Sequence, residues 1–167
     1  GDDVRLNGPV VLNSSVAITT GSTAGGDITF TNDAPIDSEV GESNNLALTA
    51  GMGSVLFNEN IGSTETLGSL TVTRADGGVV FGQADDETPG AGTTGPVNTV
   101  STDDVVDLGT TDVIAGGIVL NGGTAGTLAL QTTNDHVRLN GAVTLQSNVS
   151  IDTGDGGGDI TFTSDSP

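Results

Sequence analysis

One stretch of this chain occurs twice, and it constrains the fold more than any other feature. Residues 4–31 contain VRLNG, the apolar pairs Val10/Leu12 and Val16/Ile18, and GGDITFT; residues 137–163 contain VRLNG, Val143/Leu145, Val149/Ile151 and GGDITFT. Position 4 corresponds to 137 and position 27 to 159, so one residue is lost in the Gly-rich turn between them. Because turn length varies more easily than the side chains that face a core, this pattern is typical of repeating β-structure.

Pairs of apolar residues separated by one residue run along the whole chain. Each pair points to one side of an extended strand, while the residue between points to the other. The segments that follow this pattern between the two copies are 46–50, 54–57, 70–73, 79–82, 97–100, 105–108, 113–114, 118–120 and 128–130. Since no segment keeps the i, i+3, i+4, i+7 spacing of an amphipathic helix, we predict an all-β chain with essentially no helix.

Two intervals interrupt the strand pattern. Residues 32–45 are polar and acidic, which predicts an outward loop in which Ile36 and Val40 form at most a short extra strand. Residues 83–96 are acidic and rich in Gly, Thr and Pro, which predicts a second loop that leaves the body of the protein.

Composition decides how such short strands can bury a core. The chain has only four aromatic residues, all Phe, so the core must be thin and consist mostly of aliphatic pairs. Stacked in coils, these pairs bury one another in columns about 4.8 Å apart. We therefore predict a right-handed parallel β-helix, or β-solenoid, with three short strands per coil. An antiparallel β-sandwich is the alternative fold, because short strands at regular spacing fit it too.

The repeat also defines the predicted organisation of the chain. Residues 1–133 form one long solenoid repeat, and residues 134–167 begin the next repeat within the same solenoid. With about 20 to 22 residues in a coil, the long repeat would hold about six coils. Asparagines that follow strands are expected at corners, in left-handed backbone geometry and stacked one coil apart; they are Asn7, Asn13, Asn58, Asn121 and Asn140.

Charge and cysteine content exclude several classes of function. The net charge is −19, with three arginines and no lysine, so binding to nucleic acid or to an anionic membrane surface is not expected. The sequence has no cysteine, which excludes a disulfide scaffold and thiol catalysis. No apolar run approaches the roughly 18 residues that span a bilayer, and no signal peptide is recognised, so membrane insertion is not expected.

Several motifs resemble a known family. They are VxLNGxVxL, VxI, GGDITF, LALTAGxGSVxF and LGSLTVT, within residues 4–31, 45–82 and 137–163. These motifs look like the repeats of giant bacterial surface proteins related to filamentous haemagglutinin, which carry β-solenoid stalks. From residue 83 to 113 the resemblance is loose. It implies export to the bacterial cell surface and a role as fibre, stalk or adhesin, and it brings no set of functional residues.

Candidate chemistry in the sequence is sparse. His136 is the only imidazole and replaces Asp3 of the first copy, so we interpret it as a coil-surface residue and predict no catalytic residues and no enzyme activity. Asp152, Asp155 and Asp159 surround three glycines and faintly resemble calcium-binding turns. Calcium there or in the segment around Asp85 is the one cofactor considered; otherwise no cofactor or metal is predicted.

Two hypotheses of function follow. In the first, the chain is a structural repeat of an extracellular bacterial surface fibre or stalk, whose partner is itself, through tandem repeats or end-to-end stacking. In the second, it is a module of an adhesin stalk that binds a glycan or a host protein through loops 32–45 and 83–96. The first is favoured, because these loops lack the aromatic and arginine anchors that usually supply binding energy.

Overall fold

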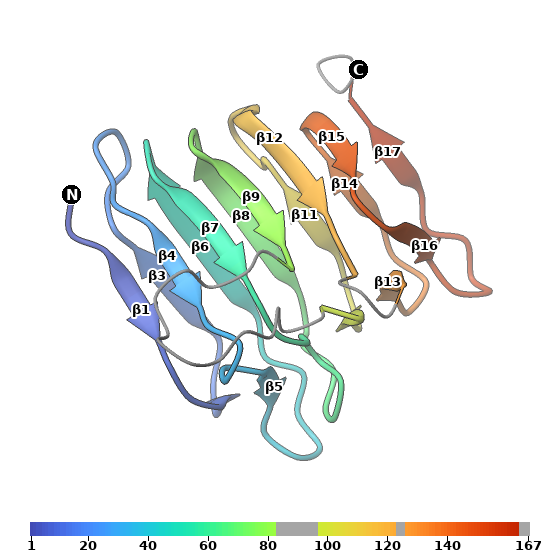
Figure 1. Ribbon diagram of the computed structural model, residues 1–167. Helices are drawn as coiled ribbons and strands as arrows, with labels where there is room; N and C mark the ends of the chain where they lie inside the picture. The colour runs from blue at the N-terminus through green and yellow to red at the C-terminus, as the bar shows by residue number, and fades with distance from the viewer. Residues whose placement is uncertain (83–96, 123–125, 164–167) are drawn as a thin grey trace.

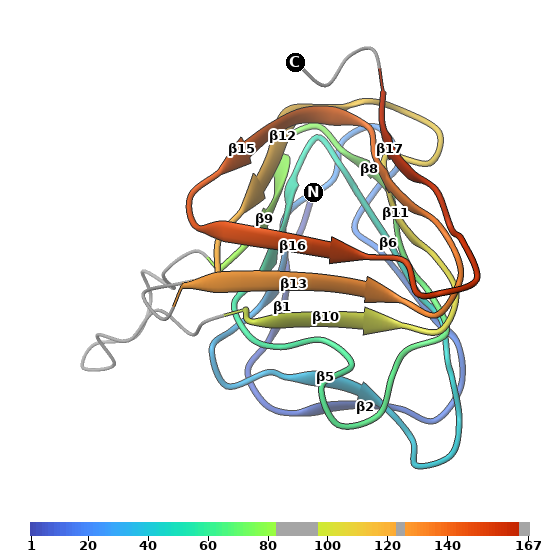
Figure 2. The ribbon, with the colours of Figure 1, turned by 90° about the vertical axis from the view of Figure 1, so that its right-hand side faces the viewer.

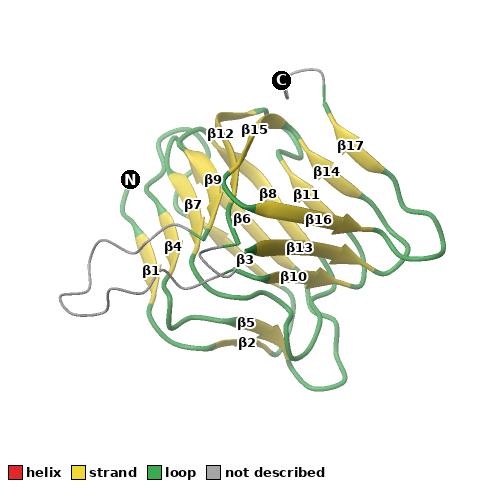
Figure 3. Cartoon of the chain, turned by 45° about the vertical axis from the view of Figure 1, so that its right-hand side comes forward, coloured by secondary structure: helices red, strands yellow, loops and turns green. Residues whose placement is uncertain are grey.

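The computed structural model is a solenoid of parallel β-strands (Figure 1). It describes residues 1–82, 97–122 and 126–163. Successive coils lie side by side from β1 near the N-terminus to β17 near the C-terminus, and every strand pair in the described residues is parallel. The described part of the chain contains strands and loops but no helix (Figure 3). The predicted all-β parallel solenoid is therefore confirmed, and the antiparallel sandwich is excluded.

The strands form three faces that outline a triangle (Figure 2). The first face contains β1 (Val4–Leu6), β4 (Ile28–Phe30), β7 (Ser54–Phe57), β9 (Gly78–Phe81), β12 (Ile114–Leu120) and β15 (Gly141–Leu145). The second face contains β2 (Val10–Leu12), β5 (Ile36–Ser38), β10 (Thr99–Thr102), β13 (Thr127–Thr132) and β16 (Asn148–Asp152). The third face contains β3 (Val16–Thr19), β6 (Leu46–Gly51), β8 (Leu70–Ala75), β11 (Val106–Leu108), β14 (Val137–Leu139) and β17 (Ile160–Phe162).

Each coil except the third contributes one strand to each face, as the alternating sequence predicts. In the third coil, the second face has no strand, but Ile61 bridges Ile36 of the coil before to Val100 of the coil after. Leu67 of the same coil also bridges to Thr102 of β10, so isolated bridges rather than a strand connect the second face through this coil. This coil is still held on the other two faces, because its own strands β7 and β8 pair with the coils before and after.

The core consists of apolar columns that run parallel to the solenoid axis. On the first face, Phe30, Phe57 and Phe81 occupy equivalent positions in consecutive coils, and all three are at most 1% exposed. Their rings stack with centroids 5.3 Å and 5.0 Å apart. Leu120 and Leu145 continue the same column. The inward residue pairs predicted from the sequence therefore do form ladders.

The coils are longer than the predicted 20 to 22 residues. On the first face, Val4, Ile28, Val55 and Val79 are partners in consecutive coils, so these coils contain 24, 27 and 24 residues. The next partner of Val79 is Ile118, which makes a coil of 39 residues that includes the segment 83–96. As a result, the interval from Val4 to Val137 holds fewer than six coils.

The prediction of an outward loop at residues 32–45 is wrong for part of this range. Ala34 and Ile36 are buried, and β5 pairs with β2, so residues 34–38 form part of the coil wall. The short strand predicted at Ile36 exists, but Val40 lies outside it and is 80% exposed. Only the corner at residues 39–45 projects outward. The sequence pattern does not show this strand clearly, because its middle residue, Asp37, is polar and points away from the core. The predicted loop at 83–96 lies outside the described residues.

The prediction that asparagines after strands adopt left-handed backbone geometry is wrong. Among the described residues, the only residue other than glycine with a positive φ is Asn134, at 65°. Glycines take the left-handed positions instead, and two asparagines cap glycines of the preceding coil. Asn121 donates from Nδ2 to the Gly82 carbonyl at 3.0 Å, and Asn140 donates to the Gly109 carbonyl at 2.8 Å. The asparagines do connect neighbouring coils, but through glycine rather than through one another.

Candidate functional site: the open end and the corners of the solenoid

The last described coil exposes apolar side chains that the first copy buries. Leu145, Ile160 and Phe162 are 61%, 45% and 52% exposed. Their counterparts in the first copy, Leu12, Ile28 and Phe30, are 2%, 0% and 1% exposed. The residue types are the same, so the difference comes from position along the axis: β4 is covered by β7, whereas β17 is the last strand of its sheet within the described residues.

The opposite end of the solenoid is also a set of sheet edges. The strands β1 and β3 are terminal in the first and third faces, and β2 is terminal in the second. Apolar residues of this first coil are only partly buried; they are Leu6, Val10, Val16 and Ile18. Strand edges that present backbone N–H and C=O groups beside apolar side chains are able to pair with a further strand. Both ends of the solenoid thus have the chemistry of a β-stacking surface.

The single histidine performs a structural role that its counterpart also performs. The Asp159 backbone N–H donates to Nδ1 of His136 at 3.1 Å, and in the first copy the Asp27 N–H donates to Oδ1 of Asp3 at 2.9 Å. His136 also lies near two carboxylates, with Nε2 3.5 Å from Oδ1 of Asp135. The imidazole side chain is 58% exposed. His136 therefore forms a contact between coils, in agreement with its interpretation as a coil-surface residue.

An open hollow of about 260 Å³ lies on the third face beside His136. It is bordered by outward side chains of β11, β14 and β17, including Asp107, Arg138 and Thr161. Arg138 pairs with Asp107 at 3.2 Å, so the cation of this hollow is already engaged by a carboxylate of the neighbouring coil. The geometry supplies a shallow, internally paired surface rather than an arrangement of a nucleophile with a base.

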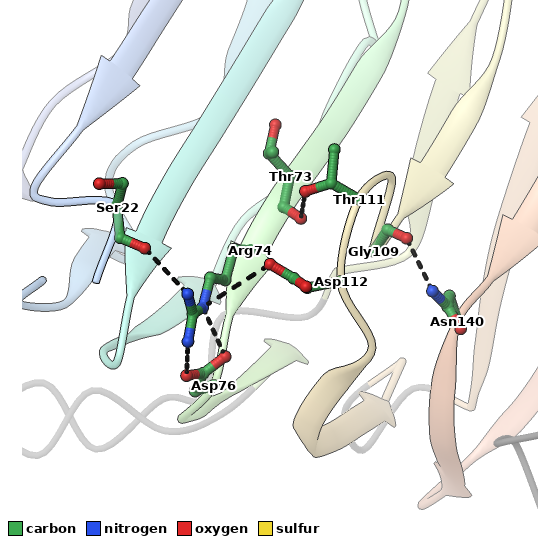
Figure 4. Close-up of polar contacts among 8 residues, drawn as sticks. All are labelled: Ser22, Thr73, Arg74, Asp76, Gly109, Thr111, Asp112 and Asn140. Atoms are coloured by element: carbon green, nitrogen blue, oxygen red, sulfur yellow. Dashed lines mark hydrogen bonds and ion pairs between the residues drawn. The ribbon is translucent and has the colours of Figure 1, made fainter. Parts of the chain in front are cut away.

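Arg74 joins the corners of several coils (Figure 4). Its Nε and Nη2 donate to the two carboxylate oxygens of Asp76 at 3.0 Å and 2.7 Å, and its Nη1 donates to the Ser22 carbonyl at 3.1 Å. Asp112, which follows β11, lies 3.9 Å from Nε. The hydrogen bond to Arg74 lowers the pKa of Asp76, and the same bond raises the pKa of Arg74. Arg74 is thus a tie between corners that are distant in sequence.

Several carboxylates bind backbone N–H groups of a neighbouring coil. Oδ1 of Asp27 accepts from the Ser54 N–H at 2.7 Å, and Oδ1 of Asp37 accepts from the Thr64 N–H at 2.9 Å. Asp103 accepts from the hydroxyls of Ser43 and Thr66. Acidic residues therefore contribute to the connection between coils, a use that the sequence analysis did not identify. The signal was present in Asp3 and Asp27, which directly precede strands.

The candidate calcium residues are not brought together. Within the described residues, no group of three or more His, Asp or Glu side chains could hold a metal ion. Oδ1 of Asp152 instead accepts from the Gly154 N–H at 2.9 Å, and Oδ2 of Asp159 lies 4.0 Å from Nδ1 of His136. The segment around Asp85 lies outside the described residues. Calcium binding by this chain stays a prediction.

Fold and surface together define a three-faced parallel β-solenoid whose structure repeats along one axis. Within the described residues, no helix is long and apolar enough to cross a membrane. Comparisons with protein-family models, with curated proteins and with solved structures gave no match. The fold is that of a β-helix repeat protein, and no family model or relative links the chain to filamentous-haemagglutinin-like proteins.

Proposed function

We propose that this chain is a structural repeat of an extracellular bacterial surface fibre or stalk. The observation that carries the proposal is that the second copy of the repeated stretch continues the ladders of the first, with β14 paired to β11, β15 to β12 and β16 to β13. A further coil stacked on β17 would also bury Phe162, which is 52% exposed, and burial of an apolar side chain of this size is worth about 1.5–3 kcal/mol. That coil can belong to the same chain or to another copy.

Continuity across the boundary between the two copies supports the same role. β14 pairs with β11 and β16 with β13 in continuous register, and β15 pairs with β12 with one register shift between Ile114 and Ile118. The second copy therefore extends the ladders of the first without a linker or a break. Tandem repetition of this sequence would lengthen one rod rather than add separate domains.

The alternative function, binding of a ligand by an adhesin stalk, has a smaller exposed loop surface than the sequence predicted. Residues 34–38 belong to the coil wall, which leaves the corner at 39–45 as the described part of loop 32–45 that could contact a ligand. In this corner Val40 is 80% exposed, but Glu39 already accepts a hydrogen bond from Asn13 at 3.1 Å. The fibre role is therefore the better supported of the two.

Imaging of the producing cells tests the proposed location and form. Antibodies against this chain, with gold-labelled secondary antibodies, are expected to mark filaments that extend from the cell surface. Labelling confined to the cell interior, or to globular particles with no filament, would contradict the proposal.

Whether chains associate through the exposed apolar side chains of β15 and β17, the open end of the solenoid, can be tested in vitro with the purified chain. Phe162→Ser combined with Leu145→Ser is expected to reduce concentration-dependent self-association in analytical ultracentrifugation, because it removes apolar surface from the uncovered coil. Val40→Ser is the matched control, since Val40 is also exposed but lies at a corner. Equal association of both variants would show that the open end is not the contact surface.

A further inference from the structure

The two copies of the repeated stretch occupy different faces of the solenoid. In the first copy, β1, β2, β3 and β4 lie on the first, second, third and first faces. In the second copy, the corresponding strands β14, β15, β16 and β17 lie on the third, first, second and third faces. The second copy is therefore displaced by one face of the triangle.

The local coil is nevertheless the same in both copies. Val4 is the partner of Ile28 and Leu6 of Phe30, and in the second copy Val137 is the partner of Ile160 and Leu139 of Phe162. The contact before the strand moves with the sequence as well. The Asp3–Asp27 hydrogen bond lies where the first face begins, and the His136–Asp159 bond lies where the third face begins. Each copy thus keeps the same local contacts between coils, although the two copies lie on different faces.

The displacement follows from the number of strand positions in one repeat. β12 is the fifth strand of the first face, so four complete coils separate it from β1. β13 and β14 then advance the chain by two further faces. The sequence repeat consequently spans four and two-thirds coils. A repeat of a whole number of coils would have placed Val137 on the first face, next to β12.

We infer that successive repeats of the fibre are turned about its axis by one face of the triangle, so that a given repeat surface returns to the same face only at every third repeat. This inference rests on the proposed function, because it concerns an array of repeats. At a coil rise of about 4.8 Å, one repeat advances by about 22 Å and three repeats by about 67 Å.

The turn determines how the fibre meets a partner. Outward residues such as Arg5 and its counterpart Arg138 lie on different faces, the first and the third. Across three repeats, each repeat surface is presented in three directions. A soluble partner that binds one repeat surface could therefore bind on all three sides of the fibre. A flat partner that lies along one face would contact that repeat surface only at every third repeat.

Cysteine pairs test the displacement in the chain itself, which contains no native cysteine. Asp107 and Arg138 are partners on adjacent parallel strands, a separation that a disulfide can bridge. Asp107→Cys with Arg138→Cys is expected to form a disulfide under mild oxidation, detected by mass spectrometry of peptides. Val119→Cys with Arg138→Cys, the pair that a whole-coil repeat would bring together, is expected to form none. The reverse result would overturn the inference.

A third pair controls for folding. Thr71 and Asp107 are partners within the first repeat, so Thr71→Cys with Asp107→Cys is expected to form a disulfide whichever way the second copy is placed. If this control forms its disulfide and the pair at 107 and 138 does not, the second copy is not displaced as inferred, and the inference is overturned.

An extended chain tests the turn between repeats. Residues 4–136 are repeated four times in tandem before residues 137–167, with Val40→Cys in each repeat as an exposed site for a small gold label. In electron micrographs, we expect the gold on three sides of a rod, with about 67 Å between labels on the same side. A single row with about 22 Å between labels would overturn the inference but leave the fibre proposal standing. Failure to form a rod would overturn both.

Discussion

Single residues at the corners hold consecutive coils together. Gly82 and Gly109 have positive φ angles of 76° and 92°, which L side chains rarely adopt, and in each case an asparagine of the next coil donates to the glycine carbonyl. A Cβ on Gly109 would lie 2.9 Å from Cβ of Asn140, so the close approach also requires glycine. The glycine and the asparagine form one unit: the first allows the turn, and the second satisfies the carbonyl that the turn leaves available.

Replacement of Asn140 by alanine is expected to destabilise the chain. Asn140 is 8% exposed, donates to the Gly109 carbonyl and accepts from the Thr163 hydroxyl at 2.8 Å. The loss of buried hydrogen bonds should lower the free energy of unfolding by about 1–3 kcal/mol. Urea denaturation followed by circular dichroism measures this change. Asn13→Ala is the control, because Asn13 is exposed; a similar change in both variants would contradict the role assigned to Asn140.

The ion pair of Arg74 with Asp76 should make the stability of the chain depend on pH. The pKa of Asp76 is lowered from 3.8 by its hydrogen bond to Arg74, so the ion pair stabilises the folded chain above the ordinary carboxyl pKa. This stabilisation is lost as the pH falls through the lowered pKa of the folded state. We therefore expect Arg74→Met to have a lower melting temperature than the native chain at pH 7, with the difference shrinking as the solution is acidified below pH 3.8.

The control for this prediction is Asp76→Asn, which removes the titrating carboxylate, so that adding Arg74→Met to Asp76→Asn should change the melting temperature by about the same amount at each pH. If the melting difference of Arg74→Met were independent of pH, the Asp76 carboxylate would not be the partner that matters. If Arg74→Met showed the same pH dependence in the Asp76→Asn background, titration of the rest of the acidic surface would explain it.

At the scale of strands, the columns of equivalent residues determine stability. Phe57 is fully buried between Phe30 and Phe81, whereas Phe162 in the last coil is 52% exposed. Phe57→Ala should therefore cost about 3–5 kcal/mol of unfolding free energy. Phe57→Leu should cost less than Phe57→Ala, because leucine fills more of the space and already occupies the same column at position 120. Phe162→Ala is expected to change stability far less than Phe57→Ala.

Guanidinium chloride titrations of the three variants check this order. A cost for Phe162→Ala equal to that for Phe57→Ala would mean that the last coil is covered in solution, as it would be if two chains had already stacked. Repeating the titration at several protein concentrations separates this case from the uncovered coil.

Strands were predictable from the sequence because each needs only a local pattern. Pairs such as Val4/Leu6 and Ile28/Phe30 alternate with outward residues, and each became a strand. β5 was recognised only in part, because its outward Asp37 and its buried Ser38 are polar. Coil length was underestimated, since it depends on how far each corner projects. Those lengths are not visible in a strand pattern.

The candidate site was less predictable than the fold. Phe30 and Phe162 lie in identical GGDITFT segments, so no sequence pattern distinguishes the buried residue from the exposed one. The displacement of the second copy is also hidden, because it follows from counting strand positions over four and two-thirds coils. Both properties belong to the arrangement of coils along the axis, which local sequence does not encode.

At the scale of the whole molecule, the strongest force that opposes stacking is charge. The chain carries 22 acidic residues and a net charge of −19 on a narrow solenoid. Like charges on successive coils repel one another, and salt screens this repulsion over a Debye length of about 10 Å at 0.1 M. A fibre made of such coils must therefore be stabilised by its apolar columns and backbone ladders against the repulsion of its surface.

Added salt is accordingly expected to stabilise the chain. The melting temperature, measured by circular dichroism at pH 7, should rise by a few degrees between 10 mM and 200 mM ionic strength, because the folded coils hold the carboxylates closer together than the unfolded chain does. MgCl₂ and CaCl₂ at equal ionic strength should give equal rises, since the described residues include no metal-binding group. A larger rise with calcium alone would instead indicate a specific calcium site. A melting temperature that falls with salt would mean that attractive ion pairs such as Arg74–Asp76 outweigh the repulsion of the acidic surface.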